Sequence, residues 1–444
     1  MNLGFYIIMA AQFFSSLADN ALLVAAIAML MQSHEPSWLT PYLKFFFVLS
    51  YVFLAPYVGA FADRLPKGQV MLLSNAIKLV GCLVMLFGVN PLAAYALVGL
   101  GAAAYSPAKY GILTEYLPPT KLVLANGWIE GLTVGSIILG TVLGGVLINR
   151  AVASRLLGFD MPYIDTGVDT PAEAALCVIS VVYAVAAVIN LYVPRTGAPI
   201  KHLHGSPLAI LRDFYRCNSR LWRDKLGQIA LAVTTLFWGV GSALQFIVIV
   251  WSHAALGFDL SQASILQGVV ALGIAAGAVA ASMRVPLHHS IRVIPIGIAM
   301  GGAVMAMALA RNVWVAVPLL VLIGALAGYF VVPMNALLQH RGHNLMGAGR
   351  SIAVQNFNEN LSILTLIAVY SLLLGLGLSI YAVIVLFGLL VSGVMALVLL
   401  WFVHNRRLYR RKIDRLLSFA RSEDYHHHHR FRAEHERASF RAAE

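Results

Sequence analysis

Charged residues are scarce in this sequence. Asp, Glu, Lys and Arg together make up 11% of its 444 residues, whereas 60% are hydrophobic. A typical soluble domain carries about 25% charged residues, so this chain has too few charges to cover a surface that faces water. Its apolar runs are long rather than short and alternating, as in helices that cross a bilayer. We therefore predict an all-α polytopic membrane protein.

Several other features are few or missing. The three cysteines, Cys82, Cys177 and Cys217, show no metal-ligand spacing, and we interpret them as small buried apolar residues. The sequence has no Gly-x-x-x-x-Gly-Lys-Ser/Thr loop and no soluble catalytic set, so neither ATP-driven transport nor an enzyme is expected, and no cofactor. His426–His429 lie in a basic tail that could bind metal weakly, but we favour a solvated, lipid-attracted tail without a metal site.

The apolar runs predict twelve spans in two groups of six. The first run, from about Leu3 to Met31, is too long for a signal peptide. The predicted spans lie near 3–31, 39–62, 69–89, 92–117, 121–149, 172–193, 225–252, 262–283, 291–310, 313–339, 348–375 and 379–403. This organisation predicts a six-helix bundle over 1–193, a central loop over 194–224, a second six-helix bundle over 225–403 and a basic tail over 404–444.

Lysine and arginine are concentrated on one side of the predicted spans. The central loop and the C-terminal tail hold most of them, and the net charge of the chain is +12. Because positively charged loops remain on the cytoplasmic side, both termini and the central loop are predicted to be cytoplasmic. The same basic surface predicts contact with anionic membrane lipids rather than with nucleic acid.

The two halves of the sequence resemble each other. Aligning GAAAYSPAKYGIL with GALAGYFVVPMNALL pairs Pro107 with Pro333, and aligning ANGWIEGLT with VQNFNENLS pairs Glu130 with Glu359. The two alignments have nearly the same offset, which indicates two parallel repeats; chance similarity between apolar segments is the alternative. Each proline lies inside a predicted span, where it is expected to kink the helix.

The loop after the second predicted span reads GAFADRLPKG. Gly59, Asp63 and Arg64 match the first half of a loop signature of the major facilitator superfamily, Gly-x-x-x-Asp-Arg, while Pro66-Lys67-Gly68 replaces its usual Gly-Arg-Arg ending. Gly59 would allow two helices to approach closely, and Asp63 would lie near a neighbouring helix end and lock one conformation by its charge. The alternative is an ordinary basic turn.

Polar side chains interrupt several predicted spans, at a depth where they are expected to face the bundle interior or a wet cavity. They are Asp19, Asn20, Lys78, Lys109, Glu130, Gln245, Gln355, Asn356, Asn358 and Glu359. The helical rise places Lys109 and Glu130 each roughly 12–14 Å from the cytoplasmic ends of consecutive spans. An ion pair between them is therefore predicted, with a structural, gating or ligand-binding role.

The other polar positions have separate interpretations. Asp19 lies farther from the cytoplasmic end and has no evident partner in the sequence, so a ligand or proton role is favoured. Lys78 is either a cavity residue or one that extends toward the headgroups. The cluster from Gln355 to Glu359 covers one turn of span eleven and is predicted to line the central cavity.

Five stretches carry a resemblance to one family. They are FFSSLADNALL (13–23), YSPAKYGIL (105–113), LANGWIEG (124–131), YFVVPMNALLQHRG (329–342) and AGRSIAVQNFNEN (348–360). In these stretches, and over essentially all twelve spans, the sequence resembles the bacterial lysophospholipid transporters of the major facilitator superfamily. Gln245 is a departure, because the family often has an arginine at that point, and this puts a cation there in doubt.

The resemblance implies a flippase that moves lysophosphatidylethanolamine and lysophosphatidylglycerol across the bacterial inner membrane to the cytoplasmic leaflet, by alternating access. It also implies a cytoplasmic acyltransferase–acyl-carrier-protein synthetase that acts in trans. Within the Tyr105-Ser-Pro-Ala-Lys motif, Lys109 would offer a cation to a phosphate or to a gating carboxylate, and Pro107 would bend the helix beside the cavity. Asp19 would suit the ammonium of an ethanolamine headgroup.

Two other classes of function remain open from the sequence. A proton-coupled exporter of drugs or small amphipathic solutes would use Asp19 as its protonatable site. A membrane scaffold or receptor for a cytoplasmic acyltransferase would need no transport at all. The cost of burying charges in the membrane argues against a mere scaffold.

Overall fold

The computed structural model describes residues 3–32, 40–149, 170–197, 206–258 and 260–418, together with Val152 and Ser154. Every regular element among them is a helix. The helices are α1 (Leu3–Gln32), α2 (Thr40–Phe53), α3 (Ala55–Arg64), α4 (Lys67–Leu86), α5 (Pro91–Tyr116), α6 (Pro119–Ile148), α8 (Pro171–Leu191), α9 (Pro207–Arg223), α10 (Gly227–Leu256), α11 (Leu260–Arg284), the short η2 (Leu287–Val293), α12 (Ile294–Met307), α13 (Val313–Met346), α14 (Ala348–Gly375) and α15 (Ile380–Leu408). The prediction of an all-helical chain is confirmed, while the His426–His429 tract lies outside the described residues.

Most of these helices are long and apolar enough to cross a bilayer. Ten helices in the described part of the chain meet that standard by length and composition, and a bent pair raises the number to 11. The predicted number was twelve. The predicted fourth span is the one that does not qualify: α5 is a continuous helix of 26 residues, but it contains Ser106, Pro107 and Lys109, which lower its apolar character.

The predicted second span is a broken helix. Leu43–Phe53 of α2 and Ala55–Arg64 of α3 are bent relative to each other by 64°. A proline occupies the first turn of α3, at Pro56, where its missing N–H costs no helical hydrogen bond. The bend therefore occurs where the second helix begins, and it sets the direction of the segment that carries Asp63.

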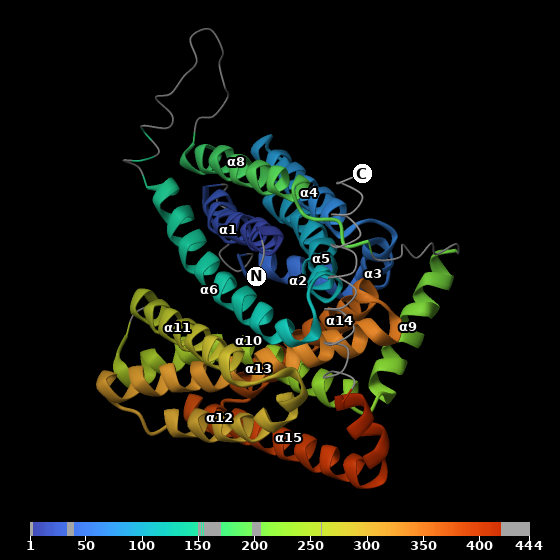
Figure 1. The fold of residues 1–444 in the computed structure, drawn as a ribbon. Helices are drawn as coiled ribbons and strands as arrows, with labels where there is room; N and C mark the ends of the chain where they lie inside the picture. Colours follow the sequence, from blue (N-terminus) through green and yellow to red (C-terminus); the bar gives the residue numbers. More distant parts are fainter. Residues whose placement is uncertain are drawn as a thin grey trace, which may run out of the picture. The chain divides into compact units, whose positions relative to one another are not determined.

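The chain forms two compact units (Figure 1). The first comprises Met1–Ile112, Gly131–Cys217 and Met346–Leu361, and the second comprises Leu113–Glu130, Asn218–Leu345 and Ser362–Glu444. Several helices are divided between the units along the sequence. Helices α5, α9 and α14 begin in the first unit and end in the second, whereas α6 begins in the second and ends in the first, where the last residue of α13 also lies. The division into bundles at 1–193 and 225–403 stays a prediction.

The first unit is organised around α8. Helices α1 and α4 both pack along it, and the three lie side by side in Figure 1. Their buried contact surface includes Leu22, Met85, Ile179 and Tyr183, all 0% exposed. A capping box begins α8, because Thr170 Oγ1 accepts a hydrogen bond from the Glu173 N–H and the Glu173 carboxylate accepts one from the Thr170 N–H. This packing brings polar side chains of α1, α4 and α8 together.

The second unit contains a close helix pair. On α11, a Cβ atom at Gly273 or Gly277 would collide with the backbone of α13, and one at Gly324 or Gly328 of α13 would collide with α11. Glycine at all of these positions lets the two backbones touch, which is a common way to associate helices where lipid removes the hydrophobic driving force. Helix α15 packs along α12 and also along α10.

Candidate functional site

A buried ion pair joins α1 to α4 in the first unit. The Lys78 ammonium lies 2.7 Å from Asp19 Oδ2. The hydroxyl of Tyr183, on α8, donates a 2.7 Å hydrogen bond to Asp19 Oδ1. Lys78 and Asp19 are not equally accessible, since their side chains are 1% and 20% exposed. The carboxylate is therefore within reach of a small polar group, while the lysine lies behind it.

Further polar groups surround the lysine. Its ammonium also donates to Ser15 Oγ at 3.0 Å, and Ser15 in turn donates to Asn75 Oδ1 at 2.7 Å. The face of the Tyr105 ring, on α5, lies 4.8 Å from the same nitrogen. We call Ser15, Asp19, Asn75, Lys78, Tyr105 and Tyr183 the acid–base centre. It draws on four helices, so its geometry depends on the packing of the whole unit.

The acid–base centre changes two interpretations made from the sequence. No partner for Asp19 was evident there, yet Lys78 and Tyr183 bind both of its carboxylate oxygens. Lys78 does not extend toward the headgroups, because it is almost fully buried and turned onto Asp19. Burying a single charge in a low-dielectric interior is costly, and the contact between the two residues offsets part of that cost.

Sequence reasoning missed Ser15, Asn75 and Tyr183. A signal existed for the first two, since Ser15 precedes Asp19 by four residues and Asn75 precedes Lys78 by three, which are spacings that place side chains on one helix face. For Tyr183, in the mostly apolar α8, the sequence contains no comparable signal.

Asn20 does not belong to the acid–base centre. Its amide donates to the Ser16 carbonyl of its own helix at 2.8 Å. Its Cβ lies where α6 approaches α1 most closely, since a Cβ built at Gly140 would be 2.8 Å away. Asn20 is therefore also a packing position of α1, and its role in substrate binding stays a prediction.

The polar turn of α14 is buried and internally bonded. Gln355 Nε2 donates to Glu359 Oε1 at 2.8 Å, and Asn358 donates to the Val354 carbonyl at 2.8 Å. Asn356 instead reaches α5, where its amide donates to Ser106 Oγ at 2.8 Å. This last bond lies in the first unit and holds α14 beside the segment of α5 that contains Pro107. Both Pro107 and Pro333 lie inside continuous helices.

A second charged junction ties α3 to the beginning of α14, also in the first unit. Asp63 accepts hydrogen bonds from the backbone N–H groups of Gly349 at 2.8 Å and Arg350 at 3.2 Å. Lys67 approaches the same carboxylate at 3.0 Å. The free N–H groups and dipole of a helix N-terminus favour an anion, so this is a favourable place for a buried carboxylate.

Close packing supports this junction. A Cβ built at Gly59 would lie 2.7 Å from the Ala353 Cβ, so glycine is needed for α3 to approach α14 this closely. Arg64 ends α3 and is half-buried. Asp63 thus lies at a neighbouring helix end; its role as a conformational lock stays a prediction.

Three further predicted residues, Lys109, Glu130 and Gln245, have surroundings of their own. Lys109 is half-buried and lies 4.3 Å from the centre of the Tyr110 ring, in the first unit. Glu130 is 5% exposed and belongs to the second unit, so the predicted ion pair between them stays a prediction. Gln245 is exposed on α10, and its backbone carbonyl accepts a 3.0 Å hydrogen bond from the side-chain amide of Gln267 on α11.

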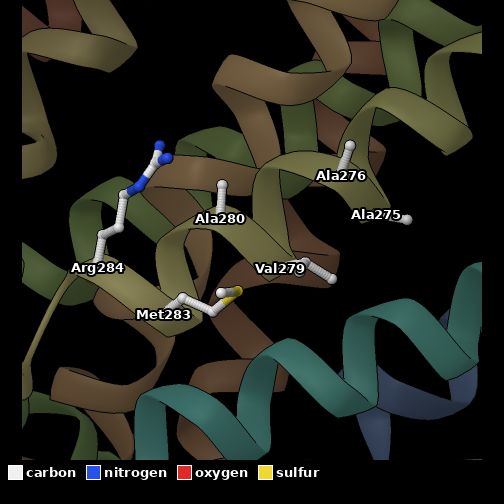
Figure 2. A pocket seen from close by; sticks show the side chains of 6 residues that line it. All are labelled: Ala275, Ala276, Val279, Ala280, Met283 and Arg284. Atoms are coloured by element: carbon white, nitrogen blue, oxygen red, sulfur yellow. The ribbon is translucent and has the colours of Figure 1, made fainter.

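One pocket lies along α11 (Figure 2). Its volume is about 490 Å³, and it is lined by Ala275, Ala276, Val279, Ala280, Met283 and Arg284. The lining is apolar except for Arg284, which stands at one end of the row in Figure 2. An aliphatic chain fits such a surface better than a polar solute does.

Comparison with known proteins agrees with this architecture. Residues 8–364 match the family model described as Major Facilitator Superfamily. Among solved structures, the human organic anion transporter MFSD10 (TETRAN) superposes with a TM-score of 0.69 at 16% identity, covering 90% of this chain and 100% of that one. The fucose:proton symporter FucP of E. coli superposes with a TM-score of 0.67 at 12% identity, covering 90% and 98%. The chain therefore belongs to the Major Facilitator Superfamily, and it is a transporter rather than an enzyme.

Within the superfamily, curated relatives are much more similar. The lysophospholipid transporter LplT of Yersinia enterocolitica is 43% identical over 380 residues, which cover 85% of this chain and 89% of that protein. LplT of Serratia proteamaculans is 44% identical over 366 residues, covering 82% and 87%. The sequence-based resemblance to the lysophospholipid transporter family is thus confirmed.

Proposed function

We propose that this protein moves lysophospholipids across the bacterial inner membrane, toward the cytoplasmic leaflet, by alternating access. The observation that carries the proposal is the buried Asp19–Lys78 pair, in a chain 43% identical to a lysophospholipid transporter over most of its length. Lysophosphatidylethanolamine and lysophosphatidylglycerol are the proposed substrates.

The acid–base centre has the chemistry to hold a phospholipid headgroup. An ethanolamine ammonium can take the place of Lys78 on the Asp19 carboxylate, which is the more accessible partner at 20% exposure. Lys78, once released, can donate to the phosphate. The Asp19–Lys78 pair is thus replaced by two pairs, ammonium with Asp19 and phosphate with Lys78. No charge is left unpaired at membrane depth.

The acyl chain requires a different surface. Burial of a lipid tail is favourable on any apolar wall, and the α11 pocket provides one. Arg284 at its end offers a cation to a headgroup phosphate. We infer that only the headgroup needs a polar path, because any apolar surface can accept the chain.

Alternating access requires helix contacts that break and form again. The hydrogen bonds from the Gly349 and Arg350 N–H groups to Asp63 are suited to this. There are only two of them, and they lie at the N-terminus of α14. We propose that Asp63 holds one access state through them and that their release permits the other. Lys109 and Glu130 are the proposed counterpart on α5 and α6.

Orientation follows the charge distribution, whereas the partner follows the family resemblance. The central loop and the tail are rich in arginine, so we propose that both, and the two termini, are cytoplasmic. A cytoplasmic acyltransferase–acyl-carrier-protein synthetase acting in trans is the proposed consumer of the transported lipid.

Proton-coupled export of small amphipathic solutes is the second candidate. It is favoured by one observation: the partly exposed Asp19 carboxylate has a buried cation beside it, an arrangement that can exchange a proton for a substrate. The two functions differ in what moves and in what drives it.

The test is transport of headgroup-labelled lysophosphatidylethanolamine into proteoliposomes of the purified protein, with and without a proton gradient. Movement without a gradient supports a facilitating flippase, and gradient-dependent movement supports a coupled flippase with Asp19 as the coupling site. No movement in either condition contradicts lysophospholipid transport and favours the exporter.

A further inference from the structure

Helix α9, in the central loop, is amphipathic. Its buried side carries Phe214 at 5%, Cys217 at 7% and Leu221 at 0% exposure. These residues recur at intervals of three and four, as expected for one face of a helix. Ser206 precedes the first residue of the helix, and its hydroxyl accepts a 3.4 Å hydrogen bond from the Ala209 N–H. This face of α9 therefore packs against other parts of the protein.

The opposite side of α9 is a row of arginines. Arg212, Arg216, Arg220 and Arg223 are all exposed. Their spacing of four, four and three residues places the guanidinium groups along one side of the helix. We call these four residues the arginine stripe.

The acidic residues nearest the arginine stripe bind other partners. Asp213 pairs with Arg350 of α14 at 3.4 Å, and Asp224 pairs with Arg341 of α13 at 2.8 Å. None of the four arginines forms an ion pair with any residue that the structure describes. The stripe is therefore a surface whose positive charge is not neutralised within the described part of the chain.

The position of α9 places this charge beside the bilayer. The helix ends at Arg223, and the membrane helix α10 begins at Gly227. It contacts α14, where the Phe214 and Phe357 rings meet edge to face with centroids 5.4 Å apart. Exposed Leu208 and Tyr215 lie beside the stripe at 66% and 56% exposure. An apolar and aromatic flank next to basic residues is typical of helices at the membrane interface.

We propose that the arginine stripe binds the phosphate headgroups of anionic phospholipids in the leaflet where α10 begins. Guanidinium groups bind phosphate in a bidentate manner, and the flanking Tyr215 and Leu208 are suited to the headgroup region. An acidic protein is a less suitable partner, because nothing in this surface discriminates against the much more abundant lipid. Each arginine is expected to increase partitioning to an anionic surface by up to roughly fivefold.

This surface is connected to the charged junction on α14. Arg350 binds Asp213 of α9 through its side chain and donates its backbone N–H to Asp63 of α3. Asp213, the neighbour of Arg212 in the stripe, is therefore linked through Arg350 to the first turn of α14, which holds Asp63. We infer that anionic lipid alters the transport rate, and this inference rests on the proposed function. The binding of lipid to the arginine stripe does not depend on that function.

The test is hydrogen exchange of residues 207–223 in the full-length protein, in nanodiscs of phosphatidylcholine alone or mixed with phosphatidylglycerol. Wild-type α9 is expected to exchange several-fold more slowly in the anionic discs. A variant with Arg212, Arg216, Arg220 and Arg223 changed to glutamine should lose this difference. A matched variant with Arg406, Arg407, Arg410 and Arg411 changed to glutamine removes the same charge elsewhere and should retain it.

Three results would overturn the proposal. Equal exchange of wild-type α9 in both kinds of disc would exclude anionic lipid as the partner. A normal lipid response in the stripe variant would exclude the stripe. Protection by added polyglutamate in phosphatidylcholine discs, without any effect of phosphatidylglycerol, would assign the surface to an acidic protein. Lysophospholipid transport measured in the same lipids distinguishes lipid binding by the stripe from the proposed function. Absence of transport would contradict the proposed function, whereas lipid binding would still be judged by hydrogen exchange alone.

Discussion

Asp19 and Lys78 lie 59 residues apart in the sequence, and their charged groups are 2.7 Å apart in the structure. The pair is buried among α1, α4 and α8, with Tyr183 holding the second carboxylate oxygen. Two opposite charges in such a place can serve stability, transport or both. Variants that separate these roles are therefore the most informative.

Single neutral substitutions should destabilise the protein. Asp19→Asn leaves the Lys78 ammonium buried without a counter-charge, and loss of one partner of a buried pair costs about 3–5 kcal/mol. Lys78→Met should cost less, because Tyr183 still binds Asp19. Thermal unfolding in detergent measures both changes.

The double variant Asp19→Asn/Lys78→Met removes both charges, so much of the lost thermal stability should return. Transport of lysophosphatidylethanolamine should not return, because neither headgroup charge then has a partner. A double variant that is stable and transports at the wild-type rate would show that the pair is only structural.

Tyr183→Phe isolates the positioning of the carboxylate. The variant keeps the ring, which is 0% exposed, and removes only the hydroxyl that donates to Asp19. A hydrogen bond to a charged group contributes about 1.5–3 kcal/mol, so unfolding should be easier but less so than in Asp19→Asn. We expect KM for lysophosphatidylethanolamine to change more than the maximal rate. Tyr57→Phe, at a 40% exposed position, is the control and should change neither.

Asp63→Asn tests the junction with α14. Asparagine can still accept one backbone N–H, but the favourable charge at the helix N-terminus is lost, a change of up to about 2 kcal/mol. The variant should have a lower melting temperature and a reduced transport rate. Asp414→Asn makes the same chemical change at a side chain that is 46% exposed and should affect neither quantity. Wild-type transport by Asp63→Asn would remove this junction from the transport cycle.

Asp224 lies in the turn between α9 and α10, and we expect it to make the stability of the folded protein depend on pH. Burial raises the pKa of its carboxyl, but the hydrogen bonds and charge of Arg341 and the N–H groups of Gly227 and Leu226 outweigh burial, so its pKa is lowered overall. The unfolded chain then binds a proton at higher pH than the folded protein does. The stabilisation is complete above the unfolded value of about 3.9 and is lost as pH falls from there through the folded pKa.

Melting temperatures measured over a series of acidic buffers check this prediction. The wild-type protein should lose stability through this acidic range, and Asp224→Asn should be less stable near neutrality with a flatter profile at acid pH. Identical profiles would show that the Asp224–Arg341 pair makes no net contribution to stability.

The sequence predicts the fold well and the site in part. Scarce charge, long apolar runs and the Gly59–Arg64 motif indicate a facilitator with many spans, and the membrane cost of charge singles out Asp19 and Lys78. The pairing of those two residues was not predicted. Helical rise gives the depth of a residue along one helix, but it does not give the rotation of that helix or its neighbours. Ser15, Asn75 and Tyr183 complete the acid–base centre only through the packing of α1 and α4 on α8.

We expect a lysophospholipid headgroup to replace Lys78 on the Asp19 carboxylate during transport. The most direct measurement is the equilibrium affinity of purified protein for lysophosphatidylethanolamine, compared between wild type, Asp19→Asn and the exposed control Asp414→Asn. Loss of one charge-assisted hydrogen-bonded pair predicts roughly tenfold weaker binding or more for Asp19→Asn, with no change in the control. Equal affinity in all three proteins would contradict the account.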